Sequence, residues 1–381
     1  MKTATSNVAE SKDDFDISEL IGFNEDDPEF RRRVGLVEKI LIQHTAMDMA
    51  IKRIKHCYAA AKDCVEPICL ALIGEARTGK TRALEFVAAQ FPSFRLADGL
   101  RVPILKVRTP SNPTVKGLAE KMLNELGDPL PGKGTETNMT ARLINLLKKA
   151  ETRMIMVDEF QHFYDKQSHK IMHHVADWLK IVVDESKVAI VVSGLPSCQA
   201  VLNQNEQLAG RFLGAVRMPR FDWMDDNSRD EFVTILTEFQ AALSEYDLPA
   251  LNSDEMAFRF YCATGGLIGY LAKILRQVVW NAIFSDSKLI TLEDIKAAYE
   301  ESVYADESKK KDMPRAFDKG FTTLVSADLL NRVKEIGVPA PEEFPRRRGR
   351  KSAENNSEDQ PENTKSKKQR KSPRTITTDV L

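Results

Sequence analysis

The residues best suited to chemistry form one short stretch, Gly74-Glu75-Ala76-Arg77-Thr78-Gly79-Lys80-Thr81, which matches the pattern G-x-x-x-x-G-K-[ST]. An apolar run at residues 68–73 precedes it, and residues 81–91 space their apolar side chains as a helix does. Glycines let the backbone point N–H groups at phosphate oxygens, and the helix start adds positive charge. Lys80 then meets the β- and γ-phosphates of ATP, and the Thr81 hydroxyl ligates Mg²⁺. We predict a nucleotide site made of Gly74, Glu75, Ala76, Arg77, Thr78, Gly79, Lys80, Thr81 and Arg82.

Two adjacent carboxylates follow another apolar run. Residues 153–157 have the composition of a buried strand, and this strand ends in Asp158-Glu159. Asp158 is placed to hold the Mg²⁺ shell, while Glu159 can polarise a water for attack on the γ-phosphate. The plain alternative is a solvated acidic pair. The position after a strand and downstream of the phosphate loop favours ATP hydrolysis instead.

The elements that must position these residues alternate along the chain. Apolar runs predict five strands, at 68–73, 102–107, 153–157, 188–192 and 213–217. Helical spacing predicts one or two helices across 29–62 and further helices at 81–91, 115–126, 139–150 and 170–183. Strands that alternate with helices indicate an α/β fold with a parallel sheet and helices on both of its faces.

The pattern changes near residue 222, because only helices follow, at about 227–243, 253–263, 267–284 and 291–304. We predict a nucleotide-binding domain at 28–222, which begins with helices at 28–63, and a small all-helical domain at 223–305. A disordered leader at 1–27, an extension at 306–344 and a disordered tail at 345–381 complete the prediction. The tail carries eleven Lys or Arg residues against five Asp or Glu residues.

Composition excludes several classes of protein. The 381 residues are 42% hydrophobic, which suffices for a packed core, and no uncharged apolar run approaches the roughly 18 residues of a membrane span. The five cysteines lack C-x-x-C spacing, so we predict neither a disulfide framework nor a zinc ribbon. We expect a cytoplasmic protein. Because the net charge is only −1, any contact with nucleic acid must come from local patches.

These features resemble a known group of proteins. Residues 74–81, residues 154–159, the polar strand end at Ser193 and the helical region after 222 resemble an AAA+ ATPase of the initiator-like group. Within that group, residues 70–81, 101–127, 157–162 and 193–196 are similar to the transposition ATPases TniB and TnsC, and the resemblance covers roughly residues 30–300. It implies an AAA+ P-loop core with a five-stranded parallel sheet and a helical lid. In the Glu-using branch of these ATPases an extra strand lies between the phosphate-loop and Asp strands, and the run at 103–107 is interpreted as that strand.

The resemblance also implies partners and cofactors. ATP and Mg²⁺ would bind between subunits that assemble as a ring or helical oligomer on duplex DNA with little sequence preference, close to the nucleoid. The assembly would recruit a transposase and a target-selection protein of the TniQ type. The predicted DNA contacts lie on the strand and helix after the first ATPase unit, and ordinary solvated side chains are their plain alternative; they are Lys106, Arg108, Thr109, Lys116 and Lys121.

Two further residues take roles from the same resemblance. Ser193 would sense the γ-phosphate through a hydrogen bond, the alternative being a hydroxyl that satisfies local backbone. Arg211 stands where these ATPases carry an arginine finger that reaches a neighbouring subunit's nucleotide, and Arg217 or Arg220 are substitutes. One expected residue is missing, because Thr264-Gly265-Gly266-Leu267-Ile268-Gly269 offers no second sensor arginine and Arg276 lies two turns later. We therefore expect slow hydrolysis.

Two other functions stay open at this stage. One is an initiator-like ATPase of replication or secretion that uses the same core for other cargo. The other is a nucleotide-gated adaptor that scarcely hydrolyses ATP and binds proteins through its tail. The ATPase activity of such an adaptor should be indifferent to duplex DNA, which separates it from a DNA-binding ATPase.

Overall fold

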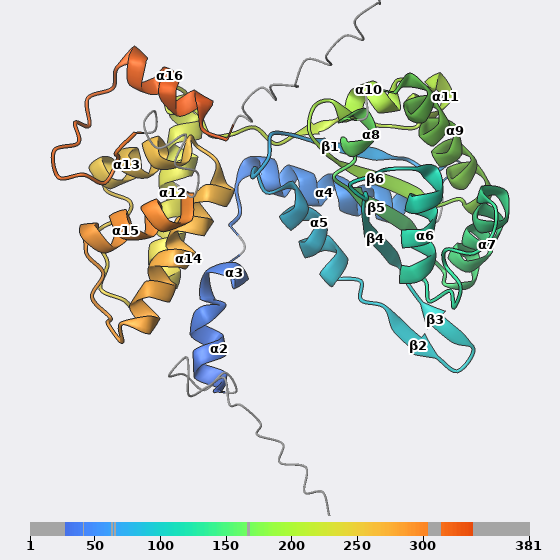
Figure 1. The fold of residues 1–381 in the computed structure, drawn as a ribbon, viewed down its shortest axis with the longest axis horizontal. Coiled ribbons are helices and arrows are strands. Elements are labelled where there is room, and N and C mark those ends of the chain that lie inside the picture. Colours follow the sequence, from blue (N-terminus) through green and yellow to red (C-terminus); the bar gives the residue numbers. More distant parts are fainter. Residues whose placement is uncertain are drawn as a thin grey trace, which may run out of the picture. The chain divides into compact units, whose positions relative to one another are not determined.

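The computed structural model describes residues 27–337, except residues 41, 62, 63, 65, 166, 167 and 304–313. Its elements run from α2 (Pro28–Val34) to α16 (Ala327–Glu335), as Figure 1 shows. Residues 1–26 of the predicted leader and the whole predicted tail at 345–381 lie outside the described residues. Of the predicted extension, only residues 314–337 are described.

Five parallel strands form the central sheet, in the order β4-β5-β6-β1-β7. They are β1 (Leu70–Ile73), β4 (Ile104–Arg108), β5 (Met154–Asp158), β6 (Ala189–Gly194) and β7 (Val216–Arg217). Every residue of β1, β5 and β6 is buried, as expected for strands that are covered on both faces. The predicted α/β fold with a five-stranded parallel sheet is thus confirmed, and the carboxyl ends of the strands meet at one edge.

The strand order corrects one prediction. The strand between β1 and β5 is β6, which pairs Leu72 with Ser193 on one side and Val157 with Val192 on the other. The run at 103–107, interpreted as the intervening strand, forms β4 at the edge of the sheet, beside β5 only. Sequence order cannot reveal this, because crossover helices let a parallel strand skip its neighbours in the chain.

Helices cover both faces of the sheet (Figure 1). The side chains of Leu72, Met156 and Val191 share one core with α4 and α5, and those of Val157 and Val192 share a second core with α6, α7 and α9. These helices are α4 (Thr45–Ala60), α5 (Lys80–Ala89), α6 (Val115–Glu125), α7 (Glu136–Lys149) and α9 (His169–Ser186). Because side chains alternate along a strand, Ser193 and Asp158 lie on the α5 face with Val191 and Met156.

Several short elements were not predicted. They are the antiparallel hairpin of β2 (Phe94–Leu96) and β3 (Gly99–Arg101), with α8 (His162–Asp165), α10 (Cys198–Leu202) and α11 (Glu206–Ala209). Each has three to five residues, so none completes enough turns or alternations to show a period.

Four helices follow the sheet, close to the predicted ranges: α12 (Asp226–Ala242), α13 (Asp254–Thr264), α14 (Ile268–Phe284) and α15 (Leu292–Val303). Capping sets their ends, since the side chains of Asp225 and Ser253 accept hydrogen bonds at the starts of α12 and α13, and Gly265 ends α13 with φ +64°. No single helix in the described part is long and apolar enough to span a membrane. The helices α13 and α14 have the required length and apolar composition only when they are taken together, and the chain bends by 109° between them.

In the described part of the chain, α2 and α3 (Leu36–Lys39) pack with these four helices. The sequence predicted that residues 28–63 belong to the nucleotide-binding domain. Val37 shares one core with Phe232 and Leu275, and the indole of Trp280 donates a hydrogen bond to the Val34 carbonyl (3.1 Å). The hydrophobic core changes between Met218, which packs with the sheet, and Phe221, which packs with the helical group. The helices α2 and α3 therefore pack against the helical group α12–α15, which we call the lid.

The segment at 314–321 is fixed to the same helical group by Arg259. Its guanidinium is buried and donates to the carbonyls of Ala316 (2.7 Å) and Asp318 (3.0 Å). Phe317 is buried in the lid core. Residues 316 and 317 of the predicted extension thus pack against the helices that follow the sheet, and α16 comes after them.

Candidate functional site

The phosphate loop has the backbone that its glycines predict. Gly79 has φ +92°, a left-handed conformation that side chains disfavour, and it directly precedes α5. A Cβ at Gly74 would overlap the carbonyl oxygen of Met218. The two glycines are therefore needed for different reasons, Gly79 for the turn and Gly74 for the close approach of Met218, which directly follows β7.

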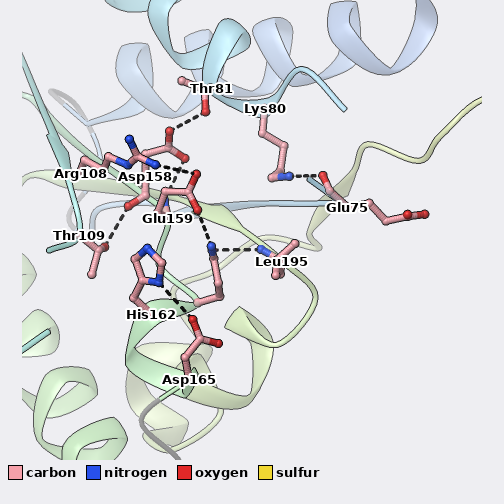
Figure 2. A network of polar contacts seen from close by, with 11 residues as sticks. Glu75, Lys80, Thr81, Arg108, Thr109, Asp158, Glu159, His162, Asp165 and Leu195 are labelled. Carbon is pink, nitrogen blue, oxygen red and sulfur yellow. Dashed lines mark hydrogen bonds and ion pairs between the residues drawn. The ribbon is translucent and has the colours of Figure 1, made fainter. Parts of the chain in front are cut away.

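Lys80 begins α5 and turns back into the loop. Its Nζ donates hydrogen bonds to the carbonyls of Gly74 (2.9 Å) and Glu75, as Figure 2 shows for Glu75, and only 8% of the residue is exposed. Burial lowers the pKa of Lys80, and the nearby carboxylates of Glu159 and Asp158 oppose that shift. An ammonium group has three donors, so one remains for a phosphate oxygen. The residue fits the role predicted for it.

The structure joins the two predicted Mg²⁺ ligands. The Thr81 hydroxyl donates to Asp158 Oδ2 (2.6 Å), although 77 residues separate them in the chain (Figure 2). Thr109 holds the same strand end, since its backbone N–H and its hydroxyl both donate to the Asp158 carbonyl at 2.9 Å. A hydroxyl and a carboxylate at this distance are oxygen donors of the kind that Mg²⁺ takes, so these residues fit the ion.

Glu159 follows Asp158 in a left-handed conformation, with φ +55°. Its backbone N–H donates to Asp158 Oδ1 (2.9 Å), and its carboxylate points between two partners (Figure 2). Oε1 lies 3.5 Å from Nη2 of Arg108, while Oε2 accepts a hydrogen bond from the side-chain amide of Gln161. The predicted general base is thus held at the carboxyl edge of the sheet, near Lys80 and Thr81 at the start of α5.

Ser193 is completely buried at the end of β6, between β1 and β5. Its hydroxyl oxygen makes no hydrogen bond to any described residue, although its carbonyl accepts one from the N–H of Phe160 (2.9 Å). The alternative interpretation, a hydroxyl that satisfies local backbone, therefore has no support here. A buried hydroxyl without a partner is costly and calls for an explanation such as a ligand.

The three candidate arginines differ in availability. The guanidinium of Arg211 forms ion pairs in its own chain with Asp184 (Nη2–Oδ1 2.5 Å) and Glu66 (3.6 Å). Arg220 is also engaged, because it pairs with Glu75 of the phosphate loop. Arg217, at the end of β7, is exposed. The structure thus places the first-choice residue in an internal contact.

The predicted DNA contacts separate into three kinds. Lys116 and Lys121 are exposed on α6. Lys106 pairs with Glu85 (3.3 Å) and Arg108 with Glu159, so both have acidic partners. Thr109 is buried and its hydroxyl is occupied by Asp158, so it is withdrawn from this set.

The remaining loop residues meet the lid and the N-terminal helices. Arg77 lies over the ring of Tyr270 (4.5 Å to the centroid), and its carbonyl accepts from the N–H of Gly269 (2.9 Å). A Cβ at Gly269 would lie 2.8 Å from Arg77 Cβ and 3.0 Å from its carbonyl oxygen. The lid helix therefore has no room here for the arginine that the sequence lacks.

The other residues predicted for the nucleotide site differ in their contacts. Ala76 is exposed, the Thr78 hydroxyl donates to the Glu75 carbonyl (2.9 Å), and Arg82 donates to the Glu38 carbonyl of α3. Sequence reasoning missed Gln161, for which its place two residues after Glu159 was the available signal. It also missed the contact of Arg220 with Glu75, for which the sequence carries no signal.

The bacterial TniB protein family matches residues 32–222, half of the chain. The chain belongs to the TniB family. The predicted resemblance is thereby confirmed. The TniB match includes the phosphate loop, Asp158, Glu159, Gln161, Ser193 and Arg211, whereas the four lid helices lie beyond it. No curated protein matches this TniB sequence.

Three solved structures of archaeal ORC and Cdc6 proteins share the fold of this TniB chain. The ORC2 protein of Aeropyrum pernix in ADPNP-ADP complexes is 10% identical with a TM-score of 0.54, over 73% of this chain and 74% of that one. Cdc6p of Pyrobaculum aerophilum is 15% identical with a TM-score of 0.52, over 74% of each chain. The ORC1 protein of Aeropyrum pernix in complex with DNA is 15% identical with a TM-score of 0.50, over 74% and 73%. Identities this low establish the fold alone, an AAA+ core with a helical region after it.

Proposed function

We propose that this TniB-family protein is an ATP-dependent, DNA-binding regulator of transposition. It would oligomerise on duplex target DNA in the ATP state and disassemble after hydrolysis. The observation that carries the proposal is the meeting of Lys80, Thr81, Asp158, Glu159 and Ser193 at one edge of the sheet, in a chain of the TniB family.

Each of these residues has a defined part in the proposed hydrolysis. Lys80 binds phosphate oxygens, and Thr81 with Asp158 holds Mg²⁺, which when bound neutralises charge on the phosphates. Glu159 takes a proton from a water whose oxygen bonds to the γ-phosphorus. The bond from that phosphorus to the bridging oxygen breaks, and ADP and inorganic phosphate leave. The Ser193 hydroxyl donates to the γ-phosphate, which gives this buried group its partner.

A neighbouring subunit would complete the site with an arginine. Arg211 can do so only after its guanidinium leaves Asp184 and Glu66, whereas Arg217 is already exposed. Lys116 and Lys121 of α6 are exposed and can follow DNA phosphates without reading bases, which agrees with binding of little sequence preference. We further propose that a transposase and a TniQ-type protein bind the assembled form.

Two variants of the full chain test the proposal. Lys80→Ala should abolish nucleotide binding, and with it ATP-dependent assembly on duplex DNA. Glu159→Gln should bind DNA in ATP more durably than wild type and lose at least about 100-fold in phosphate release. Phosphate release, fluorescence anisotropy of labelled duplex DNA and light scattering measure these quantities. Lys52→Ala, an exposed lysine on α4, is the matched control and should behave as wild type.

Three outcomes would count against the regulator. If Glu159→Gln binds DNA no better than wild type in ATP, hydrolysis does not control assembly. If phosphate release is negligible and indifferent to DNA, the nucleotide-gated adaptor is the better description. If the ATP-bound form co-purifies with neither a transposase nor a TniQ-type protein encoded beside its gene, the ATPase acts on other cargo.

A further inference from the structure

Gln161 joins the proposed general base to the strand end that carries Ser193. Its Nε2 donates to Glu159 Oε2, and its Oε1 accepts from the backbone N–H of Leu195 (3.3 Å). Only 5% of Gln161 is exposed, and both ends of its amide are used. The side chain therefore bridges the turn after β5 and the turn after β6.

The chain makes room for this bridge. A Cβ at Gly194 would overlap Gln161 Oε1, so the residue directly after Ser193 must be a glycine for the amide to come this close. The N–H of Phe160, the residue before Gln161, donates to the Ser193 carbonyl (2.9 Å) and ties the same two turns together. The amide is thus fitted to the end of β6 by packing as well as by hydrogen bonds.

Glu159 needs such support. A residue other than glycine at φ +55° costs of order 1–3 kcal/mol and persists only where its surroundings hold it. Its other side-chain partner, Arg108, lies 3.5 Å away with 74% of its side chain exposed, and solvent weakens an ion pair of this kind. The hydrogen bond from Gln161 is partly buried, and its donor side chain is only 5% exposed, so solvent weakens it less and it orients the carboxylate more strongly.

We propose that Gln161 is a positioning residue, which fixes the Glu159 carboxylate relative to Ser193 for attack of water on ATP. The inference rests on the proposed ATP hydrolysis. With Oε2 held by the amide, Oε1 is the oxygen that takes the proton, because its contact with Arg108 is long and exposed. General bases commonly depend on a second group that orients them in this way.

Two variants of nearly unchanged size test the role. Gln161→Met fills the same space without an amide, and Gln161→Glu keeps an acceptor for the Leu195 N–H but offers Glu159 no donor when ionised. Both should lower kcat for ATP by about tenfold or more, with KM and the Kd for ATP within about twofold of wild type. Steady-state phosphate release, titration with a fluorescent ATP analogue and thermal melting give these values.

The outcomes separate this inference from the function on which it rests. If Gln161→Met keeps kcat within twofold while Glu159→Gln loses hydrolysis, Gln161 does not position the base and the ATPase assignment stands. If the variants lose kcat, ATP affinity and Tm together, the role is structural and the inference fails. If wild type and Glu159→Gln release phosphate equally, the proposed hydrolytic function itself fails.

Discussion

At the residue scale, the surroundings of the Ser193 hydroxyl are the strongest indication of its role. It is fully buried between two strands, and no described residue bonds to it. A hydroxyl kept only for stability would have a partner, because an unpaired buried polar group costs roughly 1–3 kcal/mol. A hydroxyl that binds a ligand does not need a hydrogen-bond partner within the protein, because the ligand provides one. Stability and activity should therefore respond differently to its removal.

Ser193→Ala should lower kcat for ATP about 10- to 100-fold and leave Tm unchanged within about 2 °C, or slightly raised. The reason is that alanine removes a donor to the γ-phosphate and also removes an unsatisfied group from the core. Phosphate release and thermal melting measure the two effects. Ser197→Ala provides the control, since Ser197 precedes α10 without capping it. A fall in Tm with kcat retained would show that the hydroxyl serves the fold.

At the scale of elements, the phosphate loop and the lid helix α14 meet through backbone. Gly269, the second residue of α14, donates its N–H to the Arg77 carbonyl, and Arg77 covers the Tyr270 ring. In this arrangement the phosphate loop contacts the first turn of α14 directly. The contact explains why position 269 is a glycine, and from it we expect the packing of the lid to affect nucleotide affinity.

Gly269→Ala should raise the Kd for ATP several-fold and lower the free energy of unfolding by about 1–3 kcal/mol. The added Cβ would lie 2.8 Å from Arg77 Cβ, so either the helix or the loop must shift. Analogue titration and urea unfolding measure the change. Gly320→Ala is matched, because its Cβ would meet nothing within 4 Å. If neither the Kd for ATP nor the free energy of unfolding changes, the contact between Gly269 and Arg77 has room for an added methyl group.

The sequence predicted the elements that are long enough to show a periodic pattern and the site residues that lie close together along the chain. The glycines, Lys80 and the Asp158-Glu159 pair follow from spacing along the chain, as do the long helices. Strand order did not follow, because β4 lies at the edge through a crossover that leaves no mark in the run at 104–108. The burial of Thr109 and the ion pairs of Arg211 are likewise contacts between distant segments, which periodicity cannot show.

At the scale of the whole described chain, Arg220 connects three regions. Its Nε and Nη2 donate to the carboxylate of Glu75 in the phosphate loop. Its Nη1 donates to the carbonyls of Gly265, at the end of α13, and Lys334 of α16 (3.2 Å each). The arginine follows the last strand, at the point where the hydrophobic core changes from the sheet to the lid. A movement of Glu75 on nucleotide binding would therefore reach α16 through one side chain.

Arg220→Ala should increase amide hydrogen exchange in α16 roughly tenfold or more and abolish its dependence on ATP. The helix would lose a charged donor, whose hydrogen bonds contribute about 1.5–3 kcal/mol, and it would lose its connection to the loop. Exchange followed by mass spectrometry, with and without ATP, measures both effects in the wild-type chain and the variant.

Glu75→Gln separates the two halves of this connection. It leaves Arg220 its contacts with Gly265 and Lys334 and weakens only the charged contact with the loop. The helix α16 should stay protected in this variant, while the effect of ATP on its exchange should shrink. Equal exchange in wild type, Arg220→Ala and Glu75→Gln would mean that α16 is held by its packing through Leu329 and Val333 alone. The nucleotide loop would then have no route to the C-terminal helix through this arginine.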